Sequence, residues 1–416
     1  MEEYILKNNL KLIYKKSENE LSSICISLNA GAGVENDKLG IAHAAEHMIY
    51  KGTVNRSEKQ INEELSNIFG FNNAMTNYPY VIYYGTLLSE DLEKGIELFS
   101  DLLINPTFES YGFNDEMNVI KEELKEWDEE LDQYCEDKLF FNSFDNRRIK
   151  YPIIGTKESL EDIVLNDIRG FYEKYYFPEN ASIVVISSLD FEEVKNMVNQ
   201  YFISWKNRFE RKKCSKEDAD HTIEKKKINY EIPKREIFIN HIGKSKTCKV
   251  EIICPIDSLS QKEMKTFRIF NQCFGEGVNS ILYDILRTKN GLIYDVITKV
   301  SNENYIKLYK INFSTSKENI EKTLKLIEES IEKICDYINN DNRIIINDLA
   351  KSFKLKRLFR EEQSIILAKE LATYDTMFGD YNIYLDETND LNLVSKKDMI
   401  NVSKKVFNNL TVQIID

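Results

Sequence analysis

Two histidines one helical turn apart carry the clearest chemical signal in this sequence. His43 and His47 lie in the stretch Gly40–Thr53, and Glu46 directly precedes the second histidine, in the order His-x-x-Glu-His. If the stretch is helical, both imidazoles project from one face and could bind one metal ion. Zinc is the metal that imidazole and carboxylate ligands commonly hold. Glu46 would miss the metal and reach a water molecule on it, as a general base for hydrolysis does.

The alternative is a polar helix face with two incidental histidines. Only four histidines occur in 416 residues, so a pairing at this spacing by chance would be unusual. The flanking sequence strengthens the metal hypothesis, because residues 30–53, AGAGVENDKLGIAHAAEHMIYKGT, resemble the signature of the pitrilysin-like zinc peptidases almost residue for residue. This family includes insulin-degrading enzyme, the mitochondrial processing peptidase and many bacterial relatives. The other two histidines, His221 and His241, are each isolated and are expected to bind no metal.

The resemblance also implies a third zinc ligand on a later helix. In the family this ligand is a glutamate within a pattern of Glu, six residues, Glu, which Glu116 and Glu123 match, and Glu123 lies 80 residues after His43. The local pattern agrees, because apolar residues recur at helical spacing and Glu123 lies beside their stripe. A carboxylate there is costly unless it is paired or bound to metal. We expect Glu123 to bind one Zn²⁺ per chain with the two histidines, and Glu116 to orient the ligands or tune the water.

Composition excludes some classes of partner. A formal net charge of −13 disfavours nucleic acid and anionic membranes as partners. A content of 42% hydrophobic residues is ordinary for a globular chain. The seven cysteines are odd in number and scattered, with no Cys-x-x-Cys, so we expect free thiols. The first residues, MEEYILK, show no targeting pattern and no apolar run approaches the length of a membrane span, so cytoplasmic localisation is the default expectation.

The chain is long enough for two domains. Residues 1–206 read as an α+β domain with helices over a largely antiparallel sheet, and the charge-rich residues 207–228 read as a linker. Residues 229–416 restart with two strands and a helix, although no sequence repeat is visible by eye. In the family, two such related domains, each a mostly antiparallel sheet packed with helices, form one half of a clam-shell chamber, and only the first domain carries zinc.

The resemblance places a peptide-binding edge after the second helix. The family's Asn-Ala-x-Thr segment is an edge strand beside the zinc, to which substrate adds as a further strand. Here it corresponds to Asn72, Asn73, Ala74, Met75 and Thr76. An ordinary strand of the core sheet is the alternative. Pro79 and Val81 replace the family's acidic residue and threonine. Proline removes a backbone donor, which suits an edge strand, and the two replacements leave the subsites open.

A second constellation lies in the second half, in FGEGVNSILYDILRTKNGLIYDV. Its Gly275–Gly277 turn lacks the Lys-Ser/Thr ending of a phosphate loop. In the family this region is a glycine-rich loop and a helix, followed by Arg, six residues and Tyr, which Arg287 and Tyr294 match. The resemblance implies that Arg287 holds the substrate backbone and that the Tyr294 hydroxyl stabilises the oxyanion, which is reasonable chemistry for peptide hydrolysis.

Together these features predict a zinc metalloendopeptidase, and the resemblance implies that it hydrolyses peptides or unstructured segments in a closed chamber. A chain of this length is one half-shell in the family, so a homodimer with two sites is the first expectation, and a heterodimer with a related chain is the second. Two other classes stay open: a non-catalytic scaffold or peptide-binding subunit of the same fold, and a metal-dependent hydrolase of non-peptide substrates. Leader processing of a ribosomally made peptide competes with general degradation.

Overall fold

The computed structural model describes residues 1–207, 228–243 and 247–416, which form two compact units. Each unit combines one β-sheet with helices, so the expected α+β fold is confirmed. The first unit contains Met1–Lys125, Pro152–Ile228 and Arg360–Tyr384, and the second contains Glu126–Tyr151, Asn229–Phe359 and Leu385–Asp416.

The units do not follow a single division of the sequence into halves. Glu126–Tyr151 belongs to the second unit, and Arg360–Tyr384 belongs to the first. The expected linker at 207–228 lies almost entirely outside the described residues, so that boundary stays a prediction. Each unit is therefore completed by a segment from the other half of the chain.

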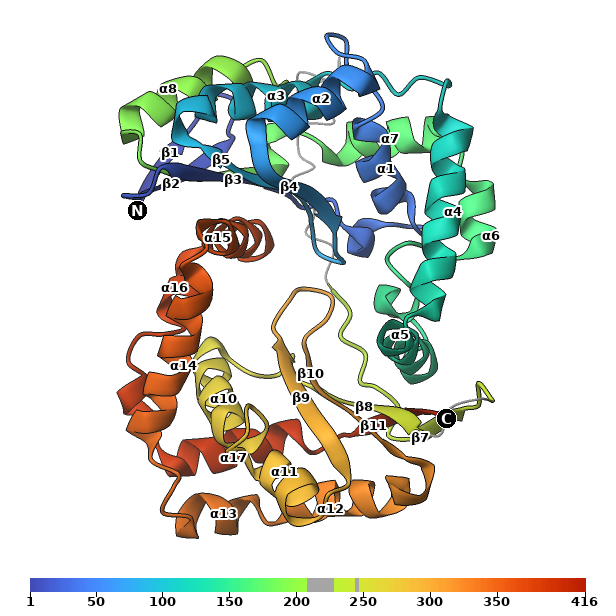
Figure 1. Cartoon of the computed structure of the whole chain (residues 1–416), viewed down its shortest axis with the longest axis vertical. Coiled ribbons are helices and arrows are strands. Elements are labelled where there is room, and N and C mark those ends of the chain that lie inside the picture. Colours follow the sequence, from blue (N-terminus) through green and yellow to red (C-terminus); the bar gives the residue numbers. More distant parts are fainter. Residues whose placement is uncertain (208–227, 244–246) are drawn as a thin grey trace, which may run out of the picture. The chain divides into compact units, whose positions relative to one another are not determined.

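The first unit is built on a six-stranded sheet. Its strands, in spatial order, are β1 (Glu2–Ile5), β2 (Lys11–Lys16), β6 (Ala181–Ser187), β3 (Leu21–Leu28), β5 (Val81–Leu88) and β4 (Phe69–Thr76). Neighbours are antiparallel except β2 and β6. The helices are α1 (Ile41–Ile49), α2 (Glu58–Ile68), α3 (Leu92–Ile104), α4 (Phe113–Glu129), α6 (Lys157–Asp162), α7 (Leu165–Tyr175), α8 (Phe191–Phe202) and α15 (Ser364–Phe378). Figure 1 shows α2, α3 and α8 on one face and α15 on the other.

The second unit repeats this topology. Its sheet has the order β7 (Ile237–Asn240), β11 (Thr411–Ile415), β8 (Thr247–Pro255), β10 (Leu308–Ser316) and β9 (Ile293–Ser301). β7 and β11 are parallel and the other neighbours antiparallel, as in β2-β6-β3-β5-β4. The helices are α5 (Leu131–Ser143), α10 (Gln261–Phe274), α11 (Ile281–Tyr283), the π-helical turn η6 (Asp284–Lys289), α12 (Ile320–Glu332), α13 (Ile334–Asn340), α14 (Ile346–Glu361) and α17 (Lys396–Val406). The shared strand order supports two related domains.

The apolar periodicity of residues 317–337 and 341–374 predicts two long amphipathic helices, and the structure divides each of them into two. The helix expected at 317–337 is α12 followed by α13, and the one expected at 341–374 is α14 followed by α15. The break before α15 falls at Gln363, which has an extended backbone. In the part of the chain that the structure describes, no helix is both long and apolar enough to cross a membrane.

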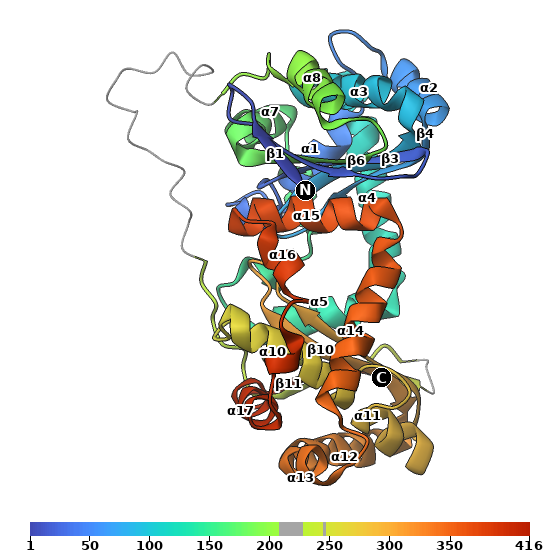
Figure 2. The ribbon, with the colours of Figure 1, turned by 90° about the vertical axis from the view of Figure 1, so that its left-hand side faces the viewer.

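α15 carries both buried apolar side chains and polar groups that bond to the first sheet. It packs against β3, β6 and β5 (Figure 2). The Ser364 and Thr376 hydroxyls of α15 lie 2.8 Å from the Ser23 and Ser27 hydroxyls of β3. The Asp375 carboxylate accepts a hydrogen bond from Lys11 Nζ at 2.7 Å. Ser23 and Ser27 thus meet hydroxyl groups of α15, and Cys25, between them on the same face of β3, is buried.

α5 covers a charged face of the second sheet. Lys310 Nζ lies 2.5 Å from Glu136 Oε2, and Lys249 Nζ lies 2.6 Å from Asp132 Oδ1. Glu251 on the same face is buried, and its Oε2 has no hydrogen-bond partner among the described residues. Burial, together with the nearby Glu136 charge, raises the pKa of Glu251 to about 8 despite the two lysines. This carboxyl group therefore stays protonated at pH 7.

Replacing Glu251 by glutamine is expected to stabilise the chain more at pH 8 than at pH 5. The native carboxyl holds its proton up to about pH 8, whereas the unfolded chain ionises near 4.5, so wild-type stability falls as the pH rises through this window. Glutamine does not titrate, and the advantage of the variant should grow by about 3 kcal/mol. Calorimetric melting at both pH values measures it. An equal Tm difference at pH 5 and pH 8 would contradict this assignment.

Candidate metal centre and active site

The start of helix α1 depends on a glycine, Gly40, and on the buried carboxylate of Glu35. Gly40, before its first residue, has φ +88°, and a Cβ there would lie 2.4 Å from the Ile154 carbonyl oxygen. The Glu35 carboxylate accepts hydrogen bonds from the backbone N–H groups of Gly40, at 3.2 Å, and Ala42, at 2.9 Å. Glu35 thus satisfies free amides at the helix start. The sequence analysis did not identify this role.

The structure brings His43, His47 and Glu123 together. His43 Nε2 lies 3.6 Å from Glu123 Oε1, and His47 Nε2 lies 3.5 Å from Glu123 Oε2. One ligand atom from each residue lies within 4.8 Å of the other two. The imidazoles come from α1, one turn apart, and the carboxylate comes from α4. This is the triad expected from the sequence.

Glu116 orients the second histidine. Its Oε1 lies 2.7 Å from His47 Nδ1. The hydrogen bond from His47 holds the pKa of Glu116 below its usual value, so the carboxylate is ionised and Nδ1–H donates to it. His47 Nε2 faces Glu123, and it is the nitrogen on which a metal ion would take the place of a proton.

Lys51 extends this chain of contacts. Its Nζ lies 3.0 Å from Glu116 Oε2 and 2.6 Å from Glu58 Oε1. Sequence reasoning missed this lysine. The available signal was its position four residues after His47, where a continued helix would place it on the same face.

Glu46 is buried, with 8% of its surface exposed. Its Oε2 accepts a hydrogen bond of 2.5 Å from the hydroxyl of Thr76, at the end of β4. Burial raises the pKa of Glu46 to about 7. A carboxyl group with a pKa near the working pH can both accept and return a proton. Thr76, expected only as part of a peptide-binding edge, therefore also contacts the candidate base.

The electrostatics of the site favour a cation between the imidazoles and Glu123. Burial lowers the pKa of His43 to about 4, so this ring is neutral at pH 7. Burial also lowers the pKa of His47, but hydrogen bonds to Glu116 and Glu123 outweigh it and raise the value to about 9. The hydrogen bond from His47 in turn lowers the pKa of Glu123. The carboxylates thus stabilise positive charge at this point.

The donor set fits a zinc ion. Ligand atoms around a tetrahedral ion with bonds of about 2.1 Å lie about 3.4 Å apart. Each histidine Nε2 lies at a similar distance, 3.6 or 3.5 Å, from one of the two Glu123 oxygens. Two imidazole nitrogens and one carboxylate oxygen leave a fourth position for water or substrate. His43 Nδ1 is buried and has no hydrogen-bond partner among the described residues, so its orientation depends on packing and on what Nε2 binds.

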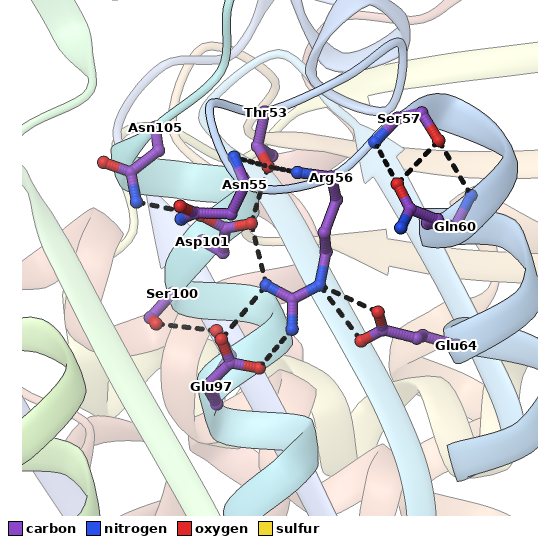
Figure 3. Close-up of polar contacts among 10 residues, drawn as sticks. All are labelled: Thr53, Asn55, Arg56, Ser57, Gln60, Glu64, Glu97, Ser100, Asp101 and Asn105. Atoms are coloured by element: carbon purple, nitrogen blue, oxygen red, sulfur yellow. Dashed lines mark hydrogen bonds and ion pairs between the residues drawn. The ribbon is translucent and has the colours of Figure 1, made fainter.

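A half-buried arginine fixes the loop that follows α1. Figure 3 shows Arg56 between carboxylates of α2 and α3: its Nε donates to Glu64 Oε2 at 3.0 Å, and its Nη1 donates to Asp101 Oδ2 at 2.9 Å. The guanidinium also pairs with Glu97 at 2.5 Å. The Thr53 hydroxyl donates to the same Asp101 oxygen at 2.6 Å. These contacts join the loop after α1 to helices α2 and α3.

The expected peptide-binding segment is an edge strand. β4 is the last strand in its sheet and contains Asn72, Asn73, Ala74, Met75 and Thr76. Its use by peptides stays a prediction.

The interpretation of Pro79 as an edge-strand residue is wrong. Pro79 lies in the buried turn between β4 and β5, and Val81 is the first residue of β5. This turn lies against Gly31, where a Cβ would come within 2.2 Å of the Asn77 carbonyl oxygen. Pro79 therefore shapes a tight turn and leaves the donors of the edge strand intact.

Arg287 and Tyr294 lie together in the second unit. The Arg287 guanidinium carbon lies 4.6 Å from the ring centroid of Tyr294 and 5.1 Å from that of Tyr283. The Tyr294 side chain is 81% exposed at the start of β9. A guanidinium on an exposed phenol is available to a ligand, and the roles expected of this pair stay predictions. His241 contacts the Asp416 carboxylate, and His221 lies outside the described residues.

Comparisons with known proteins identify the family. Residues 11–157 match the family model described as insulinase (peptidase family M16), and residues 162–342 match the model described as peptidase M16 inactive domain. The chain belongs to peptidase family M16. The resemblance to the pitrilysin-like zinc peptidases is thereby confirmed. The second description agrees with a second half that has no His-x-x-Glu-His pattern.

Relatives named as proteases or as a processing-peptidase subunit match different lengths of the chain. An uncharacterized zinc protease of Rickettsia felis is 24% identical over 412 residues, covering 99% of this chain and 96% of the relative. The uncharacterized zinc protease YmxG of Bacillus subtilis is 24% identical over 331 residues, with coverages of 79% and 77%. The mitochondrial-processing peptidase subunit beta of Neurospora crassa is 27% identical over 199 residues, 47% of this chain and 42% of that protein.

Solved structures share the fold. A protease from Helicobacter pylori superposes with a TM-score of 0.86 at 20% identity, covering 100% of this chain and 99% of that chain. A peptidase M16 inactive domain from Pseudomonas fluorescens gives a TM-score of 0.83 at 15% identity, with coverages of 100% and 97%.

Proposed function

We propose that this chain is a zinc-dependent endopeptidase. The observation that carries the proposal is the convergence of His43, His47 and Glu123 beside the buried carboxyl group of Glu46. One Zn²⁺ would be held by His43, His47 and Glu123. A bound zinc ion supplies Lewis acidity, which polarises a peptide carbonyl and lowers the pKa of water. The relatives named zinc proteases support this proposal.

Glu46 acts as the general base and then as the acid. Its carboxylate takes a proton from the attacking water and delivers it to the leaving amine, for which a pKa of about 7 is well placed. The Thr76 hydroxyl keeps the carboxylate in one orientation through its 2.5 Å hydrogen bond. An extended peptide added to the free edge of β4 would run toward this residue.

Arg287 and Tyr294 would complete the site from another chain. They belong to the second unit and carry donors suited to a carbonyl oxygen on which negative charge develops. In the family a chain of this length is one half-shell, so we infer a homodimer in which each zinc centre receives these residues from the partner. A heterodimer is the second candidate, because one relative is named as a subunit of a processing peptidase.

The first experiment is to measure metal content and peptide turnover on the same purified chain. About one zinc per chain, with cleavage of a quenched fluorescent peptide that stops on chelation, is the expected result. Zinc without cleavage of a broad peptide panel would favour a non-catalytic peptide-binding subunit. Cleavage of non-peptide esters or amides alone would favour the other hydrolase class. A chain without zinc, even after incubation with it, would overturn the proposal.

Lys51 is expected to contribute to zinc affinity although it cannot bind the metal. Its ammonium holds Glu116, which orients His47. Losing a direct partner of a metal ligand costs about tenfold to a hundredfold in affinity, and Lys51→Met, which removes only the support of that partner, should weaken zinc binding by less, about threefold to tenfold. Lys51→Arg keeps the charge and should recover part of that loss. Competition with a fluorescent chelator measures the Kd, and unchanged affinity in Lys51→Met would contradict this role.

A further inference from the structure

Phe71 is a large aromatic residue on the open edge of the first sheet. Its side chain is 50% exposed on β4, and no strand in the described part of the chain pairs with the outer side of β4. An exposed aromatic on an edge strand is a liability unless a partner covers it, because the free edge invites pairing. The sheet register pairs Phe71 with Thr86, whose hydroxyl contacts Ser23 of the α15 face. Phe71 therefore projects on the side of the sheet that α15 partly covers.

Phe71 belongs to a small cluster that we name the edge shelf, formed by Phe71, Tyr84 and Lys369. The rings of Phe71 and Tyr84 lie 5.9 Å apart at 52°. Lys369 of α15 places its Nζ 4.1 Å from the centre of the Tyr84 ring. Tyr84 itself is buried, so the accessible groups of the shelf are the Phe71 ring and the lysine ammonium.

The lysine gives the shelf an electrostatic preference. Across the described residues, no carboxylate forms an ion pair or hydrogen bond with Lys369, although the chain carries a net charge of −13. A cation on an aromatic face remains able to bind an anion. An incoming acidic side chain would complement it, and a basic one would be repelled.

Phe71 of the edge shelf lies on the same strand as Thr76, the residue that contacts the candidate base Glu46. Thr76, which contacts Glu46, is the last residue of the same strand, five residues after Phe71. At about 3.3 Å per residue, Phe71 is about 17 Å from that end. Tyr84 is paired with Asn73, two residues nearer to Thr76 than Phe71 is. A peptide added along β4 would present alternate side chains to these two positions.

We propose that the edge shelf selects substrates. It favours extended peptides with an apolar side chain against Phe71 and an acidic side chain two residues nearer to the cleaved bond, within reach of Lys369. This rests on the proposed peptidase function for its biological meaning, but it concerns binding. The apolar position lies about five residues from the cleaved bond, on one side of it.

Binding to the zinc-loaded Glu46→Gln protein tests the shelf without any need for turnover. Four combinations, Phe or Ala at one position and Glu or Lys two residues away, are placed in fluorescent peptides that are identical and polar elsewhere. Each set of four peptides is made once in each chain direction. The Phe/Glu peptide is expected to bind about tenfold more tightly than Ala/Lys, with each change contributing about threefold. Anisotropy titration gives the Kd values, and equal affinities for all four peptides would overturn the proposal.

Variants in the same background assign the preference to residues. Phe71→Ala should remove the preference for Phe over Ala, and Lys369→Glu should reverse the preference for Glu over Lys. Ile5→Ala is the matched control, because Ile5 is also an exposed apolar residue, at 61% against 50% for Phe71, and it lies on β1 at the opposite edge of the same sheet. It should change nothing. A preference that survives both shelf variants would overturn the proposal.

Hydrolysis of the same peptides by the wild-type chain separates the two hypotheses. Cleavage that shows no such preference would keep the peptidase proposal and count against the shelf. Selective binding to Glu46→Gln, with no cleavage of any peptide by the zinc-loaded wild type, would support the shelf and count against the peptidase proposal.

Discussion

Replacing Glu46 by glutamine is expected to abolish peptide hydrolysis while the chain keeps its zinc and its fold. Glutamine has the same size, and its amide oxygen can still accept the hydrogen bond that Thr76 gives to Glu46 at 2.5 Å. It cannot take a proton from water. General acid–base catalysis contributes about 10²–10⁴-fold, so kcat should fall by about 10³-fold. Turnover of a quenched peptide and zinc content by atomic absorption, on one preparation, measure both parts.

Two comparisons make this result specific to proton transfer. Glu122→Gln changes an exposed carboxylate on α4 that pairs with Lys125 at the surface, and it should leave kcat unchanged because surface ion pairs contribute little. Glu46→Asp keeps a base but shortens it, and should be more active than Glu46→Gln. Undiminished turnover in Glu46→Gln would exclude Glu46 as the base.

Replacing Glu123 by glutamine is expected to remove most of the zinc. Glu123 Oε1 and Oε2 lie 3.6 and 3.5 Å from the Nε2 atoms of the two histidines, and no other carboxylate completes a metal-binding cluster with them among the described residues. Losing an outer partner alone costs about 10- to 100-fold in affinity, so losing this ligand should cost more than about 100-fold. The side chain is 39% exposed, so the fold should survive.

The readout for Glu123→Gln is the zinc Kd from chelator competition, with circular dichroism as the check on folding. Glu126→Gln is the matched control, since Glu126 is an exposed carboxylate one turn further along α4. It should bind zinc as the wild type does. A folded Glu123→Gln protein with wild-type affinity would mean that another residue is the third ligand.

The repeated sheet topology could not be predicted from the sequence. The order β2-β6-β3-β5-β4 recurs as β7-β11-β8-β10-β9, yet no repeat is visible in the sequence by eye. Strand order depends on which segments pair, and many apolar sequences satisfy the same pairing. The position of α15 on the first sheet could not be predicted from the sequence either. Its apolar periodicity predicts a helix, but its place on β3 depends on hydroxyl contacts such as Ser364 with Ser23, 341 positions apart.

The sequence by itself determined the local part of the metal centre. His43, Glu46 and His47 lie within five residues, and helical geometry alone decides which of them share a face. Only the tertiary structure decided the contacts between segments: Glu116 on His47, Lys51 on Glu116, and Thr76 on Glu46. The physical reason is that a local pattern specifies only which side chains share a face of one helix. A hydrogen bond between residues 30 or 69 positions apart exists only after two elements have packed.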